Sequence, residues 1–164
     1  MRLTSFTDYT LRMLLHLASD ETRLVTIHDM AAMHDISKNH LMKVVYELGK
    51  AGIVETVRGR NGGFRLRRRP EDINIGAVVR LAEGDFHMAE CFGTGDVRCC
   101  FSSGCGLQHV LRRATDAWLA ELDCHTLATL LRMPQHAAPL QVLRRLPVPA
   151  APQAMQALID RSIE

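Results

Sequence analysis

The stretch "TIHDMAAMHDISKNHLMKVVYELGKAGIVETVRGRNGGFRLR", residues 26–67, decides the fold of this chain. Thr26 and Ser37 each precede an apolar pattern with helical spacing, and both residue types are favoured at the N-cap of a helix. The pattern predicts a short helix over 27–34 and a second helix that ends near Gly52. Two short helices joined by three or four residues form a helix-turn-helix. The buried face of the second helix is predicted to hold Leu41, Val44, Val45 and Leu48.

The remainder of this stretch predicts a β-hairpin. Two β-rich segments flank Gly59, Gly62 and Gly63 and a basic tip. A hairpin directly after a helix-turn-helix is the layout of a winged helix. Apolar periodicity predicts further helices, one over 5–19 and the longest from about residue 107. We therefore expect a mainly α fold with a small β-hairpin, in which a winged helix-turn-helix domain is followed by a long dimerisation helix. The expected N-caps are Thr26, Ser37, Asn74 and Thr126.

The chain is expected to have four parts. Residues 1–83 form the winged helix-turn-helix DNA-binding domain, 84–106 a cysteine-rich loop, 107–133 the dimerisation helix with a short following helix, and 134–164 a tail. The tail holds five of the six prolines, so we expect it to be mostly disordered.

The long helix carries an apolar stripe that a winged domain alone would leave exposed. We expect this stripe to be the seam of a homodimer, with burial in the chain's own core as the alternative. The stripe consists of Leu111, Ala114, Trp118 and Leu122.

Charge divides the chain into a basic front and an acidic back. Residues 1–70 carry twelve Lys and Arg against seven acids, and 71–164 carry eight against eleven. Six arginines lie within 58–69 with no acid among them. Such a basic half is typical of nucleic-acid binding, although uneven surface charge is an alternative explanation.

The second helix of the helix-turn-helix is the predicted recognition element, because such a helix fits the major groove of DNA. Its outward positions are Lys38, Asn39, His40, Lys43 and Tyr46. The tip of the hairpin offers Arg58, Arg60, Asn61 and Gly62. Arginines on a narrow tip suit a narrow groove of double-stranded DNA, where the negative potential is enhanced.

The start of the chain lacks the pattern of a signal peptide. No apolar run approaches the ~18 residues that suggest a membrane span. We therefore expect a cytoplasmic protein without a membrane partner. Disulfides rarely persist in the cytoplasm.

The stretch "CFGTGDVRCCFSSGC", residues 91–105, holds four of the five cysteines. Seven residues separate Cys91 from Cys99, four separate Cys100 from Cys105, and the paired spacing of structural zinc sites is missing. Three thiols spread over a loop rich in glycine and serine favour an iron–sulfur cluster, with zinc and unligated redox thiols as alternatives. A thiol enzyme has weak support, since no Cys/His/Asp arrangement accompanies these thiols. Cys124, in a helical stretch, is expected to be packed as a small apolar residue.

Three segments resemble a known family of regulators. "MRLTSFTDYTLRMLLHLA" (1–18), "SKNHLMKVVYELGKAGIVETVRGRNGGFRL" (37–66) and "CGLQHVLRRATDAWLAELDCHTLATLL" (105–131) are similar to the winged-helix iron–sulfur transcriptional regulators that include NsrR, IscR and RirA. The resemblance covers about residues 1–133. The motifs "TSFTDY", "NHLMKVV" and "ELDxxTLA" are most similar to the NsrR branch, which consists of nitric-oxide-sensing repressors.

The resemblance implies a repressor that carries an iron–sulfur cluster, with [4Fe-4S] as the expected type and [2Fe-2S] as the alternative. A dimer joined through the apolar stripe is expected to bind a two-fold symmetric operator. By position, Cys91, Cys99 and Cys105 match the family's ligands and Cys100 is surplus. Asp8 matches an aspartate that reaches the cluster of the other subunit. Gln108 stands where IscR-type proteins have a ligand histidine. The alternatives are an iron-responsive repressor of the RirA kind and a zinc-stabilised DNA-binding module.

Overall fold

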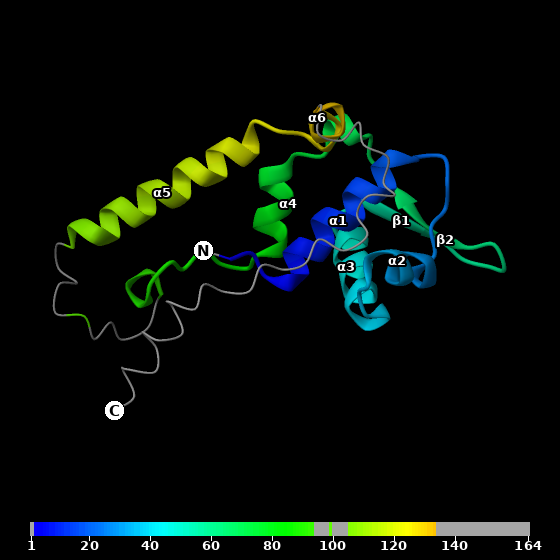
Figure 1. Ribbon diagram of the computed structural model, residues 1–164, viewed down its shortest axis with the longest axis horizontal. Helices are drawn as coiled ribbons and strands as arrows, with labels where there is room; N and C mark the ends of the chain where they lie inside the picture. Colours follow the sequence, from blue (N-terminus) through cyan, green and yellow to red (C-terminus); the bar gives the residue numbers. More distant parts are fainter. Residues whose placement is uncertain (1, 94–98, 100–104, 134–164) are drawn as a thin grey trace, which may run out of the picture. The chain divides into compact units, whose positions relative to one another are not determined.

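The structure is a computed structural model that describes residues 2–93, 99 and 105–133 (Figure 1). The elements are α1 (Ser5–Ser19), α2 (Ile27–His34), α3 (Lys38–Lys50), β1 (Val54–Val57), β2 (Gly63–Leu66), the 3-10 turn η1 (Pro70–Asp72), α4 (Ile75–Ala82), the 3-10 turn η2 (Glu90–Phe92), α5 (Gly106–Asp123) and α6 (Leu127–Arg132). This order confirms the predicted mainly α fold with one small hairpin. No helix in the described ranges is long and apolar enough to span a membrane. The tail predicted over 134–164 lies outside the described residues.

The helices begin where their capping residues predicted. Each of the four expected N-caps accepts a hydrogen bond from the backbone N–H three residues later: Thr26, Ser37, Asn74 and Thr126. α3, the predicted recognition helix, ends at Lys50, and Gly52 follows with a φ of 67°. This left-handed conformation favours glycine and stops the helix before β1.

The hairpin is fastened to the rest of the chain at one edge. β1 pairs with β2 in antiparallel register, with Val57 opposite Gly63. Phe64 N donates to Val25 O at 2.9 Å, and Val25 N donates to Phe64 O at 3.0 Å. A Cβ on Gly63 would lie 2.7 Å from Val25 O, so this close approach of two backbones requires glycine. The base of the wing therefore has a fixed place beside the segment that leads into α2.

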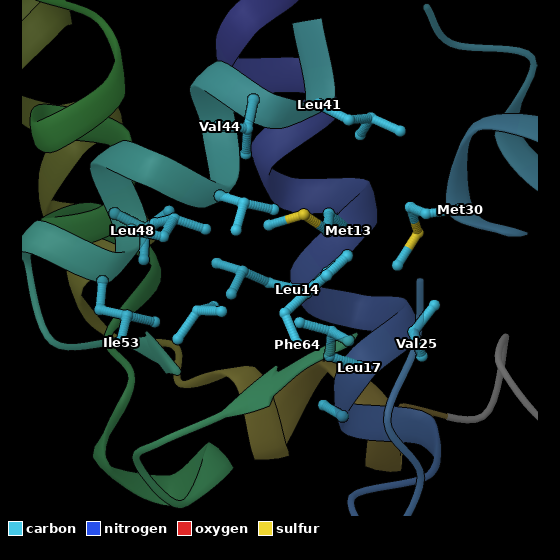
Figure 2. Packing of buried hydrophobic residues seen from close by; sticks show 14 of the residues in the cluster. Met13, Leu14, Leu17, Val25, Met30, Leu41, Val44, Leu48, Ile53 and Phe64 are labelled. Carbon is cyan, nitrogen blue, oxygen red and sulfur yellow. The ribbon is translucent and has the colours of Figure 1, made fainter. Parts of the chain in front are cut away.

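One apolar core joins the helices to the hairpin (Figure 2). α1, α3 and β2 contribute many of the side chains that are at most 2% exposed: Met13, Leu14, Leu17, Leu41, Val44, Leu48 and Phe64. The predicted buried face of α3 is thus confirmed, and its other face is turned to the surface. α6 follows the long helix in sequence, yet it packs against α1 and Leu127 is 1% exposed. The division into four parts stays a prediction, but the core of the first part extends to α6.

A pair of histidines joins α1 to α2. The rings of His16 and His34 meet edge to face, with centroids 5.3 Å apart. Nδ1 of His16 and Nε2 of His34 are buried with no hydrogen-bond partner among the described residues. Burial lowers the pKa of both imidazoles below the ordinary 6.5, and the charges of Arg12 and Arg23 act in the same direction. The folded chain therefore favours both rings in their neutral form.

We expect this pair to make the folded state less stable in acid. Because both folded pKa values lie below the unfolded value, the stability is full above about pH 6.5 and falls as the pH drops towards the folded values. The measurement is the free energy of unfolding in urea at about pH 7.5 and about pH 5.5. His34→Gln should reduce the difference between the two, whereas His28→Gln, at an exposed position of α2, should not. The same pH dependence in the wild type and in His34→Gln would contradict this role.

Candidate DNA-binding surface and cysteine site

The exposed face of α3 carries all five predicted recognition residues. Lys38, Asn39, His40, Lys43 and Tyr46 are exposed, while the opposite face of α3 is buried in the core. Because Ser37 is the N-cap, three of them lie in the first turn, the part of a recognition helix that enters the major groove first. The side chains thus lie where base edges could be reached.

Two further side chains affect this face, and the sequence analysis missed both. Met42 is 51% exposed and can contact the methyl group of thymine. The signal for it was available, because the buried positions of α3 leave residue 42 on the outside. Tyr9 of α1 lies against His40, with ring centroids 5.8 Å apart. This contact connects α1 to the first turn of the recognition helix, and no local pattern could have predicted it.

The wing carries fewer arginines for DNA than its composition suggested. Arg58 and Arg60 are exposed at the tip. Arg65 instead pairs with Glu55 across the hairpin at 2.7 Å. Arg68 donates to the carbonyl oxygens of Ala51 and Gly52, at 2.9 and 3.1 Å, and so closes the end of α3. Arg69 pairs with Asp72 at 3.0 Å. Three of the six arginines therefore serve the fold, and the tip remains the basic element aimed outward.

A glutamine connects the segment of the first predicted cluster ligand to the helix that the last predicted ligand caps. Cys91 lies in η2 and Cys105 is the N-cap of α5, and both are half-buried. Gln108, in the first turn of α5, donates from Nε2 to the carbonyl oxygen of Cys91 at 2.7 Å. Beside it, the guanidinium of Arg112 lies 5.5 Å from the centre of the Phe92 ring. The segment that bears Cys91 is therefore held against the start of the long helix.

The chemistry of these thiols fits a thiolate-bound cofactor. Cys91, Cys99 and Cys105 are free thiols rather than disulfides, and Cys99 is exposed. The Cys105 thiol makes no capping hydrogen bond to α5. Within the described ranges, no three Cys, His, Asp or Glu side chains of one chain converge as metal ligands. Cys100 lies outside those ranges, so its surplus role stays a prediction.

Cys124 does not pack as expected. It is exposed at the C-cap of α5, and its thiol donates to the carbonyl oxygen of Ala120 at 3.3 Å. The expectation was wrong because residue 124 follows the last turn of the helix and leaves its packed face.

Asp8 lies in the first turn of α1 and forms an ion pair with Arg12, with Oδ2 and Nη2 2.8 Å apart. Both side chains are about half exposed. The start of the same helix is tied to the end of α4, because Thr4 N donates to Oε1 of Glu83 at 2.7 Å. Asp8 therefore lies four residues after the point at which α1 is tied to the end of α4.

An exposed recognition helix and a basic wing on a winged-helix core define a DNA-binding transcriptional regulator. The chain belongs to the Rrf2 family of iron-dependent transcriptional regulators, whose sequence profile matches residues 3–133. This membership confirms the resemblance drawn from the sequence. A regulator of this class is not an enzyme.

Individual relatives agree with this assignment. The chain is 53% identical over 137 residues to the HTH-type transcriptional regulator NsrR of Bacillus licheniformis, which covers 83% of this chain and 96% of that protein. It is 39% identical over 158 residues to Protein aau3 of Rhizobium meliloti, covering 96% of this chain and 100% of that protein. Among solved structures, the oxidized form of CymR from Staphylococcus aureus is similar with a TM-score of 0.65 and 28% identity, covering 80% of this chain and 97% of that one.

Asn39 and Arg60 should differ in the way they contribute to DNA binding. Asn39→Ala should cost about 1–3 kcal/mol on the preferred sequence and relax the preference at one base pair. Arg60→Ala should weaken all sequences alike and reduce the salt dependence of binding, because a phosphate contact carries no base information. Affinities for a selected operator and for random duplex DNA, measured over a range of salt, separate the two. Arg132→Ala, which removes an exposed arginine of α6, is the matched control. An intact sequence preference in Asn39→Ala would show that α3 is misassigned.

Proposed function

We propose that this protein is a homodimeric transcriptional repressor whose binding to a two-fold symmetric operator is controlled by an iron–sulfur cluster that responds to nitric oxide. It acts in the cytoplasm on double-stranded DNA. The observation that carries the proposal is the bond from Gln108 to the backbone of Cys91. This bond joins the cysteine-bearing segment to the long helix α5. The DNA-binding surface belongs to the same chain.

The thiolates of Cys91, Cys99 and Cys105 would hold the cluster, and Asp8 of the partner subunit would supply the fourth, weaker ligand. The bond from Gln108 to Cys91 would hold η2 against the start of α5, together with the contact of Arg112 with Phe92. When bound, the cluster supplies a group that reacts with nitric oxide and is lost when iron is scarce. The residues that hold the cluster transmit its state to the DNA-binding surface.

A chain of contacts links the cysteine segment to the recognition helix. Glu83 precedes the cysteine segment and accepts a hydrogen bond from Thr4 at the start of α1. Four residues after that start, Asp8 lies beside Tyr9, and the Tyr9 ring contacts His40 of α3. A displacement of Asp8 or of the cysteine segment therefore reaches the first turn of the recognition helix through α1. Figure 1 shows α1 lying between α4 and α3.

The dimer seam lies on α5, but its centre differs from the predicted stripe. Trp118 and Leu122 are half-buried against the chain's own core, and the Trp118 ring contacts Phe86 with centroids 6.1 Å apart. Ala114, in contrast, is exposed. Four of the five exposed apolar residues of α5 share a helical stripe, and Ala120 lies outside it. The stripe consists of Leu107, Val110, Ala114 and Ala117. We assign this stripe to the contact between the two copies of α5.

A charge placed on this stripe should separate the dimer. Ala114→Asp would bury two carboxylates at the seam without a partner, so we expect a monomer in sedimentation experiments at micromolar concentration. Ala120→Asp makes the same change at an exposed position on another face of α5 and should remain dimeric. A wild-type monomer, or dimers in both variants, would contradict the assigned seam.

An iron-responsive regulator is the second candidate, because the family itself is described as iron-dependent. The same cysteines would then report the supply of iron rather than nitric oxide. The two candidates share every residue named above and differ only in the signal that ends DNA binding.

Operator binding by protein purified without oxygen separates these functions. We expect brown protein that binds an operator selected from random duplex DNA and releases it when nitric oxide is added. Release only after iron is removed with a chelator would favour the iron-responsive candidate. Unchanged binding after both treatments would contradict control by a cluster, and colourless protein that contains zinc would favour the zinc-stabilised module.

Cysteine variants test the ligand set by their visible absorption. Cys91→Ala, Cys99→Ala and Cys105→Ala should each lose it, because each removes a thiolate. Cys100→Ala should keep most of it, and Cys124→Ala, which removes the exposed thiol of α5, is the control that should keep all of it. A colourless Cys100→Ala beside a brown Cys99→Ala would exchange their roles.

A further inference from the structure

The end of α5 is locked to α4 by a two-pronged ion pair. Nη1 and Nη2 of Arg80 donate to Oδ1 and Oδ2 of Asp123, at 2.5 and 2.7 Å. Arg80 lies in the last turn of α4, and Asp123 is the last residue of α5. The pair lowers the pKa of Asp123, chiefly through the hydrogen bonds from Arg80, and raises that of Arg80. Two parallel hydrogen bonds fix the direction of a contact as well as its distance.

Hydrogen bonds to the backbone fix the same junction from a second side. Asn74, the N-cap of α4, donates from Nδ2 to the carbonyl oxygen of Asp123 at 2.7 Å. Ile75 N donates to His125 O at 3.0 Å, and the isolated bridge between Asn74 and Thr126 continues this pairing. The last turn of α5 and the start of α6 are therefore attached along the first turn of α4.

Gly76 allows the two helices to meet this closely. It is buried in the first turn of α4, and a Cβ at this position would collide with the carboxylate of Asp123. No helical reason calls for glycine there, since glycine lowers the stability of a helix interior relative to alanine. The close approach of Asp123 is the reason that the structure provides.

The junction contributes geometry more than stability. The Arg80 and Asp123 side chains are 43% and 42% exposed, and ion pairs in water contribute little to folding. Their arrangement nevertheless sets the direction in which α5 leaves the winged-helix core. If α5 joins the two subunits, as proposed above, this direction sets the distance and rotation between the two recognition helices.

We propose that Arg80, Asp123 and Gly76 are positioning residues that determine which spacing of operator half-sites the dimer accepts. The inference rests on the proposed dimer. Two recognition helices must enter successive major grooves on one side of the duplex, so a small change in the direction of α5 is multiplied along its length. A rigid junction accepts one spacing, and a loosened junction accepts several.

The experiment measures affinity for duplexes in which two selected half-sites are moved apart or together by one and two base pairs, and for a duplex with a single half-site. The affinity of the wild type should fall about tenfold or more when the spacing changes by one base pair, because the second half-site rotates around the duplex. Arg80→Lys keeps the charge but loses the second prong, and Gly76→Ala displaces Asp123. The affinity of both variants should fall less than about threefold across the same spacings, while their affinity for the single half-site stays unchanged. Arg132→Lys alters another exposed ion pair, with Glu71, and should behave as the wild type does.

Each outcome decides one statement. Spacing preferences as sharp as the wild type's in both Arg80→Lys and Gly76→Ala would overturn the positioning role. An equal loss of affinity on every duplex, including the single half-site, would show a defect of the DNA-binding surface. This result would also overturn the positioning role. A wild type that binds all spacings and the single half-site equally would instead contradict the proposed dimer on a two-fold operator. Sedimentation should show that each variant is a dimer, so that a changed spacing preference is not confused with loss of the dimer.

Discussion

Burial of one face of α3 against α1 is the constraint on which the other features of this protein depend. Leu41, Val44 and Leu48 are excluded from water. The opposite face of α3, which carries Asn39, Lys43 and Tyr46, is therefore turned outward. The same packing fixes α1 behind the recognition helix, where Tyr9 contacts His40. A hydrophobic requirement therefore produces both the exposed face of α3 and the contact between α1 and the first turn of α3.

The contacts that connect the parts of the chain are of a different kind. These contacts join polar groups that are exposed or half-exposed: Gln108 with Cys91, Thr4 with Glu83, and Arg80 with Asp123. Such contacts contribute little to the free energy of folding, but they are directional. A core of apolar side chains supplies the stability, and polar junctions supply the geometry. This division suits a regulator, because a junction can change while the core remains folded.

Local signals predicted the elements well where a physical cause acts within a few residues. Ser37 caps α3 because its hydroxyl reaches the N–H three residues later, and Gly52 ends the helix because it adopts a positive φ. Cys124 shows the limit of such reasoning. It lies in a helical stretch of sequence, but its burial depended on which side of the helix end another element would occupy, and no local pattern carries that information.

By itself, the sequence determined the helix-turn-helix, the wing and the outward face of α3, since periodicity and capping are local consequences of residue type. Tertiary structure alone decided how the remaining groups are used. It assigned Arg68 to the end of α3 rather than to DNA, placed Trp118 against the chain's own core, and brought Asp123 to Arg80 and Gly76. These partners are far apart in sequence, and only the packing of whole elements brings them together.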